Sequence, residues 1–462
     1  MTNKVSIAQC DPAAKMKKLP QQLPGSQPVE RRLLLILLAA FFSLTILLDI
    51  LSPPITTFTV LIAYVVIFSL LRLCAREHQS VDRAATQERE SEFTQPLVSI
   101  VIPAHNEELV IAMTIKSMLQ IDYPNYELLV VDDHSTDQTA AILRSIHTAA
   151  DSRFRYYSRP AESRQGKAAS INDALTQTSG KLIAVFDADA QVEPDFLTKM
   201  VPYFANPLVG AVQGKKKLIN ANQNLLTSCQ QNEYYMDHHF QAVRDTIRSA
   251  VELRGNGMLL RRTALEELGG LNERAIAEDL DLCTRMHTEG WDVRFAQDAV
   301  VSEEAPITLD ALFKQRIRWT EGCILRYFDH AQRILFNRKL ALRTKLDASL
   351  FILEFIGPAW LLMENLVLIA RLLSGTLPPQ PLLFAAPAMT VLCLYFIYAS
   401  LVGIYKEENG SISKTAKGTL MVYLYLTLLF VPIIFHLMFK FLKNKERNLA
   451  WYKTPRYGAA MK

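Results

Sequence analysis

Two long apolar stretches close to the start of the chain, residues 33–51 and 55–71, most constrain what it can fold into. Each is long enough to cross the hydrocarbon core of a bilayer as an α-helix, which rises about 1.5 Å per residue. Three further apolar stretches follow at residues 348–373, 381–404 and 418–440. The pattern predicts an integral, multi-pass membrane protein with transmembrane α-helices on both sides of a soluble middle.

Basic residues set the predicted orientation of the chain. Arg31 and Arg32 precede the first apolar stretch, and Arg72 and Arg76 follow the second. Cytoplasmic loops are enriched in Lys and Arg, so both ends of this hairpin are predicted to be cytoplasmic. The soluble middle is then cytoplasmic as well.

These observations divide the chain into seven predicted regions. They are a disordered cytoplasmic tail (1–30), a transmembrane hairpin (31–77), a linker (78–96), a soluble α/β domain (97–330), an interfacial basic segment (331–347), C-terminal transmembrane helices (348–442) and a basic tail (443–462). Five spans would place the basic tail outside, against the rule for basic loops. Either the stretch that contains Pro358 is interfacial or re-entrant, or the tail is an exception.

The charge balance argues against nucleic acid as a partner. The formal net charge is only +4. The basic cluster of Arg338, Lys339, Arg343 and Lys345 lies beside predicted membrane segments, where anionic lipid headgroups are the more fitting partners. The six cysteines are scattered without the close pairs that metal sites use, and we interpret them as structural or incidental.

The soluble middle alternates between strand-like and helix-like segments. Strands are predicted at 97–103, 127–133 and 181–189, and helices at 107–120, 136–150 and 167–178. Strands that alternate with helices indicate a parallel sheet covered on both faces, with ligands beyond the carboxyl ends of the strands. The predicted fold class is therefore α/β, Rossmann-like, with a mostly parallel sheet.

Acidic side chains stand at the ends of all three predicted strands. Glu107 follows the first strand, Asp132 and Asp133 end the second, and Asp187 and Asp189 end the third. An edge this acidic repels itself unless a cation or a donor-rich ligand lies on it. The sequence has no P-loop or GxGxxG to hold phosphates through backbone amides. A Mg²⁺ or Mn²⁺ ion that bridges to a diphosphate is therefore predicted here.

Some of these residues also have a purely structural interpretation. Taken alone, Asp187 and Asp189 are more typical of a turn than of a metal site. Side chains alternate along a strand, so both aspartates are expected on one face, although one alone can reach the metal. Lys167 stands at the start of a predicted helix, where it is either a solvated lysine or a cation for a diphosphate or sugar.

Two later segments have the same double interpretation. Glu278 and Asp279 begin a predicted helix, where the helix dipole alone favours carboxylates. Gln315, Arg318 and Trp319 recur at helical spacing. They fit either an amphipathic helix on the membrane surface, or a site in which Arg318 meets a phosphate and Trp319 lines a sugar.

Six motifs in a fixed order carry a resemblance to a known family. They are VSIVIPAHNEE, VVDDHSTD, GKAASIND, FDADA, AEDLDL and QRIRW, spread over residues 98–322. In this order they resemble the membrane-bound family-2 glycosyltransferases, whose catalytic domain has a GT-A fold. His134 stands where many relatives have Gly, and Ala277 where Thr is frequent. Neither departure removes a carboxylate that the chemistry needs.

The resemblance implies roles for the matched positions. For the donor, uridine would be held by Ala104, Glu107 and Asp133, the nucleotide-sugar by Lys167 and Asp187, and the Mg²⁺ (or Mn²⁺) on the diphosphate by Asp189. For the acceptor, the general base would be Asp279, and the acceptor and diphosphate would be bordered by Gln315, Arg318 and Trp319. Displacement from the side opposite the diphosphate would invert an α-linked UDP-sugar and give a β-glycoside.

The family contains both polysaccharide synthases and enzymes that glycosylate a lipid once. GKAASINDAL, VGAVQGKKKLINA and VELRGNGMLLRRTALEELGGLNE are similar to the cyanobacterial β-monoglucosyldiacylglycerol synthases. This resemblance implies transfer of glucose from UDP-glucose to 1,2-diacylglycerol in the lipid bilayer. A processive exopolysaccharide synthase of the poly-N-acetylglucosamine or hyaluronan type shares every motif and stays an alternative. The complete set of carboxylates argues against a third alternative, a non-catalytic nucleotide-sugar sensor.

Three remaining features receive structural interpretations. His238 and His239 diverge on a predicted helix, so packing or lining of the acceptor site is expected. The three lysines at 215–217 are expected at a solvated edge. Glu354 and Glu364 lie near an apolar stretch, where carboxylates are costly unless they line a polar path. They are the best indication of a channel.

Overall fold

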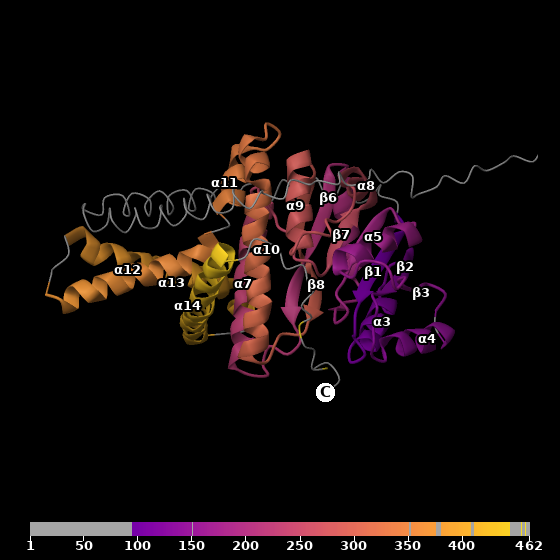
Figure 1. The fold of residues 1–462 in the computed structure, drawn as a ribbon, viewed down its shortest axis with the longest axis horizontal. Coiled ribbons are helices and arrows are strands. Elements are labelled where there is room, and N and C mark those ends of the chain that lie inside the picture. The colour runs from indigo at the N-terminus through magenta and orange to yellow at the C-terminus, as the bar shows by residue number, and fades with distance from the viewer. Residues whose placement is uncertain are drawn as a thin grey trace, which may run out of the picture.

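Figure 1 shows the computed structural model of the chain, which describes residues 95–149, 151–350, 353–375, 380–407 and 411–443, with Thr454 and Gly458. The predicted tail 1–30, the hairpin 31–77, and nearly all of the linker and of the basic tail lie outside these residues. The described residues cover the soluble middle and most of the C-terminal helices.

One eight-stranded sheet forms the centre of the described residues. In chain order its strands are β1 (Val98–Ala104), β2 (Tyr126–Asp132), β3 (Phe154–Ser158), β4 (Leu182–Val185), β5 (Gln191–Val192), β6 (Val209–Leu218), β7 (Met258–Arg261) and β8 (Asp292–Glu303). Their order across the sheet is β3-β2-β1-β4-β7-β6-β8-β5. Strands β1 to β4 pair in parallel, as predicted, and so do β6 and β8. Because β7 is antiparallel to β4 and β6, and β5 to β8, the sheet is mixed rather than mostly parallel.

Helices cover both faces of this sheet. They are α3 (Ile111–Leu119), α4 (Thr139–Ala149), α5 (Lys167–Gln177), α6 (Phe196–Met200), the 3₁₀ helix η2 (Val201–Ala205), α8 (Arg262–Leu268) and α9 (Glu278–Glu289). On one face Ile102 of β1 belongs to the same core as Ile115 of α3. On the other face Val101 of β1 belongs to a core with Ile171 of α5 and Leu282 of α9. Successive residues of β1 enter opposite cores, which explains why this strand is almost entirely apolar.

Two long helices join the sheet to the C-terminal helices. In Figure 1, α7 (Leu225–Thr246) and α10 (Leu309–Phe336) lie between the sheet and the helices α12 (Leu353–Leu373), α13 (Gln380–Glu407) and α14 (Ile412–Lys443). The short α11 (Leu342–Leu350) stands between α10 and α12 in the chain. Apolar clusters fill this junction. One includes Cys229 of α7, Leu312 of α10 and Ile433 of α14, and another includes Tyr235 of α7 and Leu401 of α13.

The C-terminal helices differ in how well they could cross a membrane. Within the described part of the chain, one helix is long and apolar enough, Ile412–Phe441 in α14, and α13 has a shorter apolar stretch at Thr390–Val402. The range of α12 includes Pro358, so this proline does not end the helix. The side chains of Glu354 and Glu364 lie outside the described residues. The number of spans therefore stays a prediction.

Candidate active site

The loop after β4 separates the two aspartates that were expected on one face of a strand, Asp187 and Asp189. β4 ends at Val185, and the backbone N–H of Ala190 donates to the carbonyl of Asp187 (3.0 Å) in a turn. The Asp187 side chain is partly exposed, whereas Asp189 is only 4% exposed and accepts a hydrogen bond from the backbone N–H of Glu304 (2.9 Å). The expectation that both leave one face of a strand was wrong, because the strand ends before either residue.

Lys167 is a largely buried cation at the start of α5, with 16% of its side chain exposed. Its Nζ lies 2.5 Å from Oδ1 of Asp187 and 3.8 Å from Oε1 of Glu278, and it donates to the carbonyl of Gly255 (2.9 Å). Burial lowers the pKa of Lys167, but the attraction of Asp187 and Glu278 outweighs it, so the pKa is raised overall. The ammonium group stays charged, and the solvated-lysine interpretation does not fit its surroundings.

Asp133 is fully buried and ties together three segments of the chain. Its carboxylate lies 2.5 Å from Nη1 of Arg159 and 2.9 Å from Nδ1 of His134, and accepts a hydrogen bond from the backbone N–H of Gly166 (2.8 Å). The backbone N–H of Asp133 donates to the carbonyl of Ala104 (2.8 Å). This network fixes the chain that leads into α5, and it includes Arg159, which the sequence analysis missed.

The first turn of α9 brings two carboxylates close to Lys167. The pKa of Glu278 is raised mainly because the side chain is buried. The attraction of Lys167 lowers this pKa but does not cancel the effect of burial. Asp279 accepts a hydrogen bond from the backbone N–H of Leu280 (2.8 Å) and faces Gly255. A Cβ at Gly255, whose φ is +74°, would lie 3.0 Å from Oδ2 of Asp279 and 3.3 Å from Nζ of Lys167. Glycine thus lets the backbone approach Asp279 closely.

Asn256 connects Asp187 to a buried ion pair. Its side chain accepts a hydrogen bond from the backbone N–H of Asp187 (3.1 Å) and donates to Oε2 of Glu303 (2.7 Å). Oε1 of Glu303 lies 2.8 Å from Nζ of Lys216 and accepts from the hydroxyl of Tyr234 (2.5 Å). The expected solvated edge is therefore wrong for Lys216. β6 lies between β7 and β8 rather than at an edge, and this lysine points inward from it.

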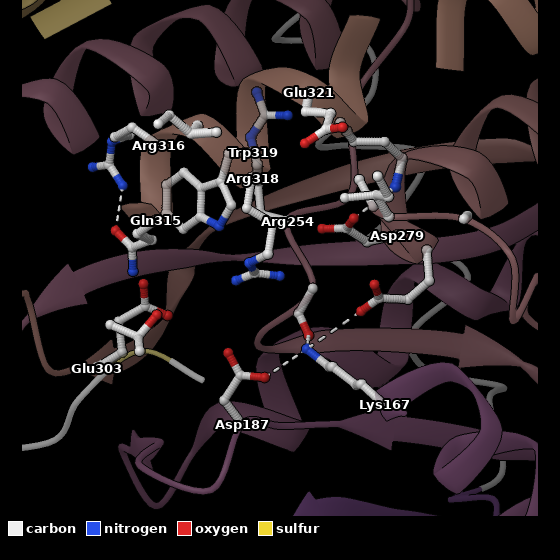
Figure 2. A pocket seen from close by; sticks show the side chains of 18 of the residues that line it. Lys167, Asp187, Arg254, Asp279, Glu303, Gln315, Arg316, Arg318, Trp319 and Glu321 are labelled. Carbon is white, nitrogen blue, oxygen red and sulfur yellow. Dashed lines mark hydrogen bonds and ion pairs between the residues drawn. The ribbon is translucent and has the colours of Figure 1, made fainter. Parts of the chain in front are cut away.

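Arg254, in the loop before β7, points into the same region. Its Nε and Nη2 donate to the carboxylate of Asp237 on α7, at 3.2 and 2.6 Å. Figure 2 shows the Arg254 side chain reaching toward Asp187, whereas Arg318 extends to the other side, near Glu321. The sequence analysis did not single out Arg254. The signal available was the pair of glycines that alternates with polar residues in VELRGNGMLL, between two apolar runs.

The QRIRW segment lies in α10 and faces inward. Arg316 is 1% exposed, lies 2.7 Å from Oε2 of Glu233 on α7, and donates to Oε1 of Gln315 (2.6 Å). The Trp319 ring has two cations near it, with Cζ of Arg316 4.1 Å and Nζ of Lys216 5.6 Å from its centroid. These contacts favour the site interpretation over a membrane-surface helix. Arg316 is a further member that the sequence analysis missed.

A cavity of about 540 Å³ collects these side chains. Seven of the ten predicted site residues line it, namely Glu107, Lys167, Asp187, Asp279, Gln315, Arg318 and Trp319, while Ala104, Asp133 and Asp189 are not in its lining. Its apolar lining includes residues of α7, α10 and α14, namely Met236, Phe240, Ile317, Leu426 and Phe430. The cavity therefore joins the charged loops of the sheet to a helix that is long enough to cross a membrane.

Comparison with known proteins identifies the family. The family model described as glycosyltransferase like family 2 matches residues 95–322. The chain is 35% identical over 382 residues to the β-monoglucosyldiacylglycerol synthase of Nostoc sp., an alignment that covers 80% of this chain and 79% of that protein. The chain belongs to the family-2 glycosyltransferases. It is also 33% identical to the synthase of the same name from Synechocystis sp., over 79% of this chain and 76% of that one.

This glycosyltransferase has the GT-A fold. It superposes on the mannosyltransferase PcManGT from Pyrobaculum calidifontis, solved in complex with GDP-Man and Mn²⁺, with a TM-score of 0.53. The superposition covers 78% of this chain and 99% of that chain, at 20% sequence identity. At this identity the likeness concerns the fold alone. The predicted GT-A architecture is confirmed, with a mixed sheet in place of a mostly parallel one.

The described residues of this glycosyltransferase offer carboxylates to a divalent cation, but no ready-made cluster. No group of three or more His, Cys, Asp or Glu side chains in that part of the chain is arranged to hold a metal. Asp187 is the member of the predicted pair that lines the cavity. Mg²⁺ commonly takes one or two protein carboxylates and completes its shell with phosphate oxygens and water. The site thus fits a cation that arrives with a diphosphate.

Proposed function

We propose that this glycosyltransferase moves glucose from UDP-glucose to the free hydroxyl of 1,2-diacylglycerol and forms a β-monoglucosyldiacylglycerol. The observation that carries the proposal is the shared cavity, which is lined by Lys167 and Asp187 and also by Leu426 and Phe430 of α14. A lipid acceptor needs polar groups around its hydroxyl and apolar surface along its chains. The relatives named β-monoglucosyldiacylglycerol synthase support the same acceptor.

The donor is assigned to the loops at the carboxyl ends of β1, β2 and β4. Uridine would be held by Ala104, Glu107 and Asp133, and the nucleotide-sugar by Lys167 and Asp187. A Mg²⁺ or Mn²⁺ ion, held by Asp189 or by its neighbour Asp187, would neutralise charge on the diphosphate as it leaves. Gln315, Arg318 and Trp319 would border the diphosphate and the acceptor.

Asp279 is the proposed general base. It lies beside Gly255 and Lys167, in the first turn of α9, and lines the cavity. In the proposed step Asp279 takes the proton of the acceptor hydroxyl while the hydroxyl oxygen bonds to the anomeric carbon. The bond from that carbon to the diphosphate oxygen breaks, and UDP leaves with the electron pair. Attack from the side opposite the diphosphate inverts the α-linked donor and produces a β-linkage.

Ion pairing around the cavity supports an uncharged acceptor headgroup. Six of the cations that line the cavity have carboxylate partners, among them Arg254 with Asp237 (2.6 Å), Arg316 with Glu233 (2.7 Å) and Lys440 with Glu321 (2.7 Å). A lipid phosphate would compete with these carboxylates and add negative charge near the proposed base. The hydroxyl of diacylglycerol adds no charge, and it fits this arrangement better.

The same proposal makes the protein a multi-pass membrane enzyme with a cytoplasmic catalytic domain. α14 has the length and composition of a membrane span. The remaining spans rest on apolar stretches of the sequence, above all 33–51 and 55–71. Basic residues flank that pair, and they support the cytoplasmic side for the domain that follows.

A processive polysaccharide synthase is the second candidate. The chain is 30% identical to the probable glucomannan 4-β-mannosyltransferase 10 of Arabidopsis thaliana, over 80% of this chain and 67% of that one. The catalytic motifs do not distinguish a single transfer from chain elongation. A growing sugar chain would have to pass apolar side chains such as Leu426 and Phe430, which favours the lipid acceptor.

Labelled donor and partitioning of the product test the proposal. Membranes that contain the protein are supplied with radiolabelled UDP-glucose, Mg²⁺ and diacylglycerol, and the products are extracted with chloroform. We expect a chloroform-soluble glucolipid that a β-glucosidase cleaves. Label found only in an aqueous or insoluble polymer would contradict the proposal of a lipid acceptor. Parallel reactions with UDP-galactose and UDP-N-acetylglucosamine identify the donor sugar.

Asp279→Asn tests the assignment of the base. Turnover should fall by about 10²-fold to 10⁴-fold, the usual contribution of a general base. Binding of UDP, measured by calorimetry on the full-length protein, should stay within about twofold, because Asp279 is not assigned to the nucleotide. Asp310→Asn is the matched control, since the Asp310 side chain is 76% exposed on α10. Normal turnover in Asp279→Asn would show that another group takes the proton.

A further inference from the structure

A glycine just before β7 brings the backbone there very close to β8. A Cβ added at Gly257, whose φ is +68°, would lie only 2.4 Å from Cγ1 of Val301. The backbone N–H of Gly257 donates to the carbonyl of Val185 at the end of β4 (3.0 Å), and its carbonyl accepts from the N–H of Gly214 in β6 (2.9 Å). No residue with a side chain fits here without strain. The preceding residue, Asn256, is therefore held between the ends of β4 and β8.

The Asn256 side chain is fully buried and lies between two acidic residues of the cavity lining. Its Oδ1 accepts a hydrogen bond from the backbone N–H of Asp187 (3.1 Å), and its Nδ2 donates to Oε2 of Glu303 (2.7 Å). The backbone carbonyl of Asn256 accepts from Nε2 of Gln213 (2.8 Å), which fixes the main chain at this point. The two ends of the amide thus have different tasks, because one end only accepts and the other only donates.

The charge of Glu303 decides which way the Asn256 amide points. Oε1 of Glu303 lies 2.8 Å from Nζ of Lys216 and accepts from the hydroxyl of Tyr234 (2.5 Å). Burial would raise the pKa of Glu303, but the attraction of Lys216 and the hydrogen bond from Asn256 outweigh it, and the pKa is lowered. An ionised carboxylate only accepts hydrogen bonds. Glu303 therefore requires the NH₂ group of Asn256, which leaves the amide oxygen for Asp187.

We propose that Asn256 and Glu303 are positioning residues for Asp187, and that ionised Glu303 sets the place of Asp187 in the cavity through the Asn256 amide. In Figure 2 the carboxylates of Glu303 and Asp187 lie below Gln315 and Trp319. The inference rests on the proposed function, in which Asp187 meets the nucleotide-sugar or its divalent cation. A side chain in that position must be held within about 0.5 Å of its working geometry. Partners that orient a metal ligand are as much a part of such a site as the ligand itself.

Binding of UDP in the presence of Mn²⁺ tests this inference without any assay of turnover. Calorimetry on the full-length protein in nanodiscs compares the parent with Asn256→Asp and with Glu303→Gln. In Asn256→Asp two carboxylates would face each other, and a weakly alkaline pH disfavours a proton shared between them. In Glu303→Gln the remaining oxygen should face Lys216, so the new NH₂ group would meet the NH₂ group of Asn256. Each change should weaken binding about tenfold or more, the usual cost of losing a partner that orients a metal ligand.

The double variant separates positioning from a general loss of structure. Asn256→Asp combined with Glu303→Gln exchanges the donor and the acceptor between the two positions. The new carboxylate can accept from the backbone N–H of Asp187 as before, and the new NH₂ group can donate to that carboxylate. Because the polarity of the contact is restored, binding of UDP with Mn²⁺ should return to within about threefold of the parent.

Asn272→Asp is the matched control for a buried amide beside a carboxylate. Asn272 is 8% exposed and donates to Oδ1 of Asp281 (3.2 Å), and neither residue lines the cavity. The change should lower the temperature of thermal unfolding, yet leave the affinity for UDP with Mn²⁺ within about twofold of the parent. Thermal unfolding of every sample shows whether it folds. If Asn256→Asp does not fold, Glu303→Gln and the double variant still decide the question.

Three results would contradict the inference, and they differ in what else they contradict. Parent-like affinity in Asn256→Asp and Glu303→Gln would show that Asp187 keeps its place without them. A folded double variant that binds as weakly as the single variants would show that the polarity of the contact is irrelevant. A parent protein that does not bind UDP with Mn²⁺ would overturn the donor assignment in the proposed function, and this inference with it.

Discussion

Charged side chains in the site are partly or fully buried together with carboxylate or cationic partners. Arg254 donates two hydrogen bonds to Asp237, from Nε and Nη2. Burial would raise the pKa of Asp237, but the attraction of Arg254 outweighs it, and the pKa is lowered. Two parallel hydrogen bonds fix the plane of a guanidinium group, which a single ammonium group cannot reproduce. The position of Arg254 in the cavity therefore depends on Asp237.

Arg254→Lys should lower kcat/KM for sugar transfer at least about tenfold, because lysine keeps the charge and loses the two-point attachment. Asp237→Asn should act in the same direction. Lys314→Arg is the matched control, since the Lys314 side chain is 50% exposed at the cavity. It should change kcat/KM by less than about twofold. Initial rates at varied donor concentration measure all three, and parent-like rates for Arg254→Lys would contradict the argument.

His238 lines the cavity and is 6% exposed, stacked on Phe295 at 6.3 Å between ring centroids. Burial lowers its pKa from 6.5 to about 3, against the attraction of Asp237. The unfolded chain takes up a proton at this histidine near pH 6.5 and the folded protein does not, so stability is lost as the pH falls below 6.5. Each pH unit in this window costs about 1.4 kcal/mol.

His238→Phe should therefore make stability less sensitive to acid. The free energy of unfolding of the full-length protein in detergent is compared for the parent and the variant at two pH values. One is well above 6.5 and the other is one unit below 6.5. The parent should lose about 1.4 kcal/mol more than the variant over this interval, because phenylalanine cannot be protonated. An equal loss in both proteins would show that other groups account for the acid sensitivity.

Single residues could be predicted from sequence where a motif places them at the end of a strand or helix. Four such residues line the cavity, namely Glu107, Lys167, Asp187 and Asp279, while Gln315, Arg318 and Trp319 line it from within α10 and were predicted from helical spacing. Arg159, Arg254 and Arg316 could not be found in this way, because their carboxylate partners are distant in the sequence. His134 has a φ of 60°, the left-handed conformation, and that conformation accounts for the glycine that many relatives have there.

Among the elements, α7 contacts both the C-terminal helices and the site within one turn. Asn232 accepts a hydrogen bond from the hydroxyl of Tyr405 on α13 (2.8 Å), and Glu233 accepts one from Tyr425 on α14 (2.9 Å). The next residue, Tyr234, donates to the carboxylate at the end of β8 (2.5 Å). α7 therefore holds the catalytic domain against the C-terminal helices α13 and α14.

Glu233→Gln should destabilise the protein strongly. Arg316 is 1% exposed and would keep its charge without a carboxylate partner, which costs about 3 kcal/mol or more at a buried site. Glu289→Gln is the matched control, because its partner Lys339 is exposed. Denaturant or thermal unfolding in detergent compares the two. Similar small effects would mean that Tyr425 or water replaces the lost carboxylate at Arg316.

The elements of the first half of the domain could be predicted because they follow simple periodic patterns. β1, β2, α3, α4 and α5 lie within the predicted ranges or a residue beyond them. Strand β3 was not predicted, and neither were the strands from β5 to β8, because their pairing is decided by neighbours distant in the chain. β6, for example, ends in three lysines and reads as a surface segment, yet it lies between β7 and β8.

At the scale of the whole molecule, the cavity is built jointly by the catalytic domain and α14. Phe430→Trp should raise KM for diacylglycerol about tenfold or more, because a larger side chain takes up space in a packed lining. KM for the UDP-sugar should stay unchanged. Leu428→Trp on the same helix is the control, since Leu428 is 74% exposed. Equal effects on both substrates would show that Phe430 supports the fold rather than the acceptor.

The contacts of α7 also decide how this enzyme can be isolated. A protein cut before α12 would lose Tyr425 and with it one partner of Glu233, the carboxylate that Arg316 needs. The cut would also remove Ile433 and expose the apolar cluster around Cys229 to water. Such a fragment should aggregate during purification. A faithful sample of the catalytic centre therefore requires the whole chain, carried in detergent or in a lipid disc.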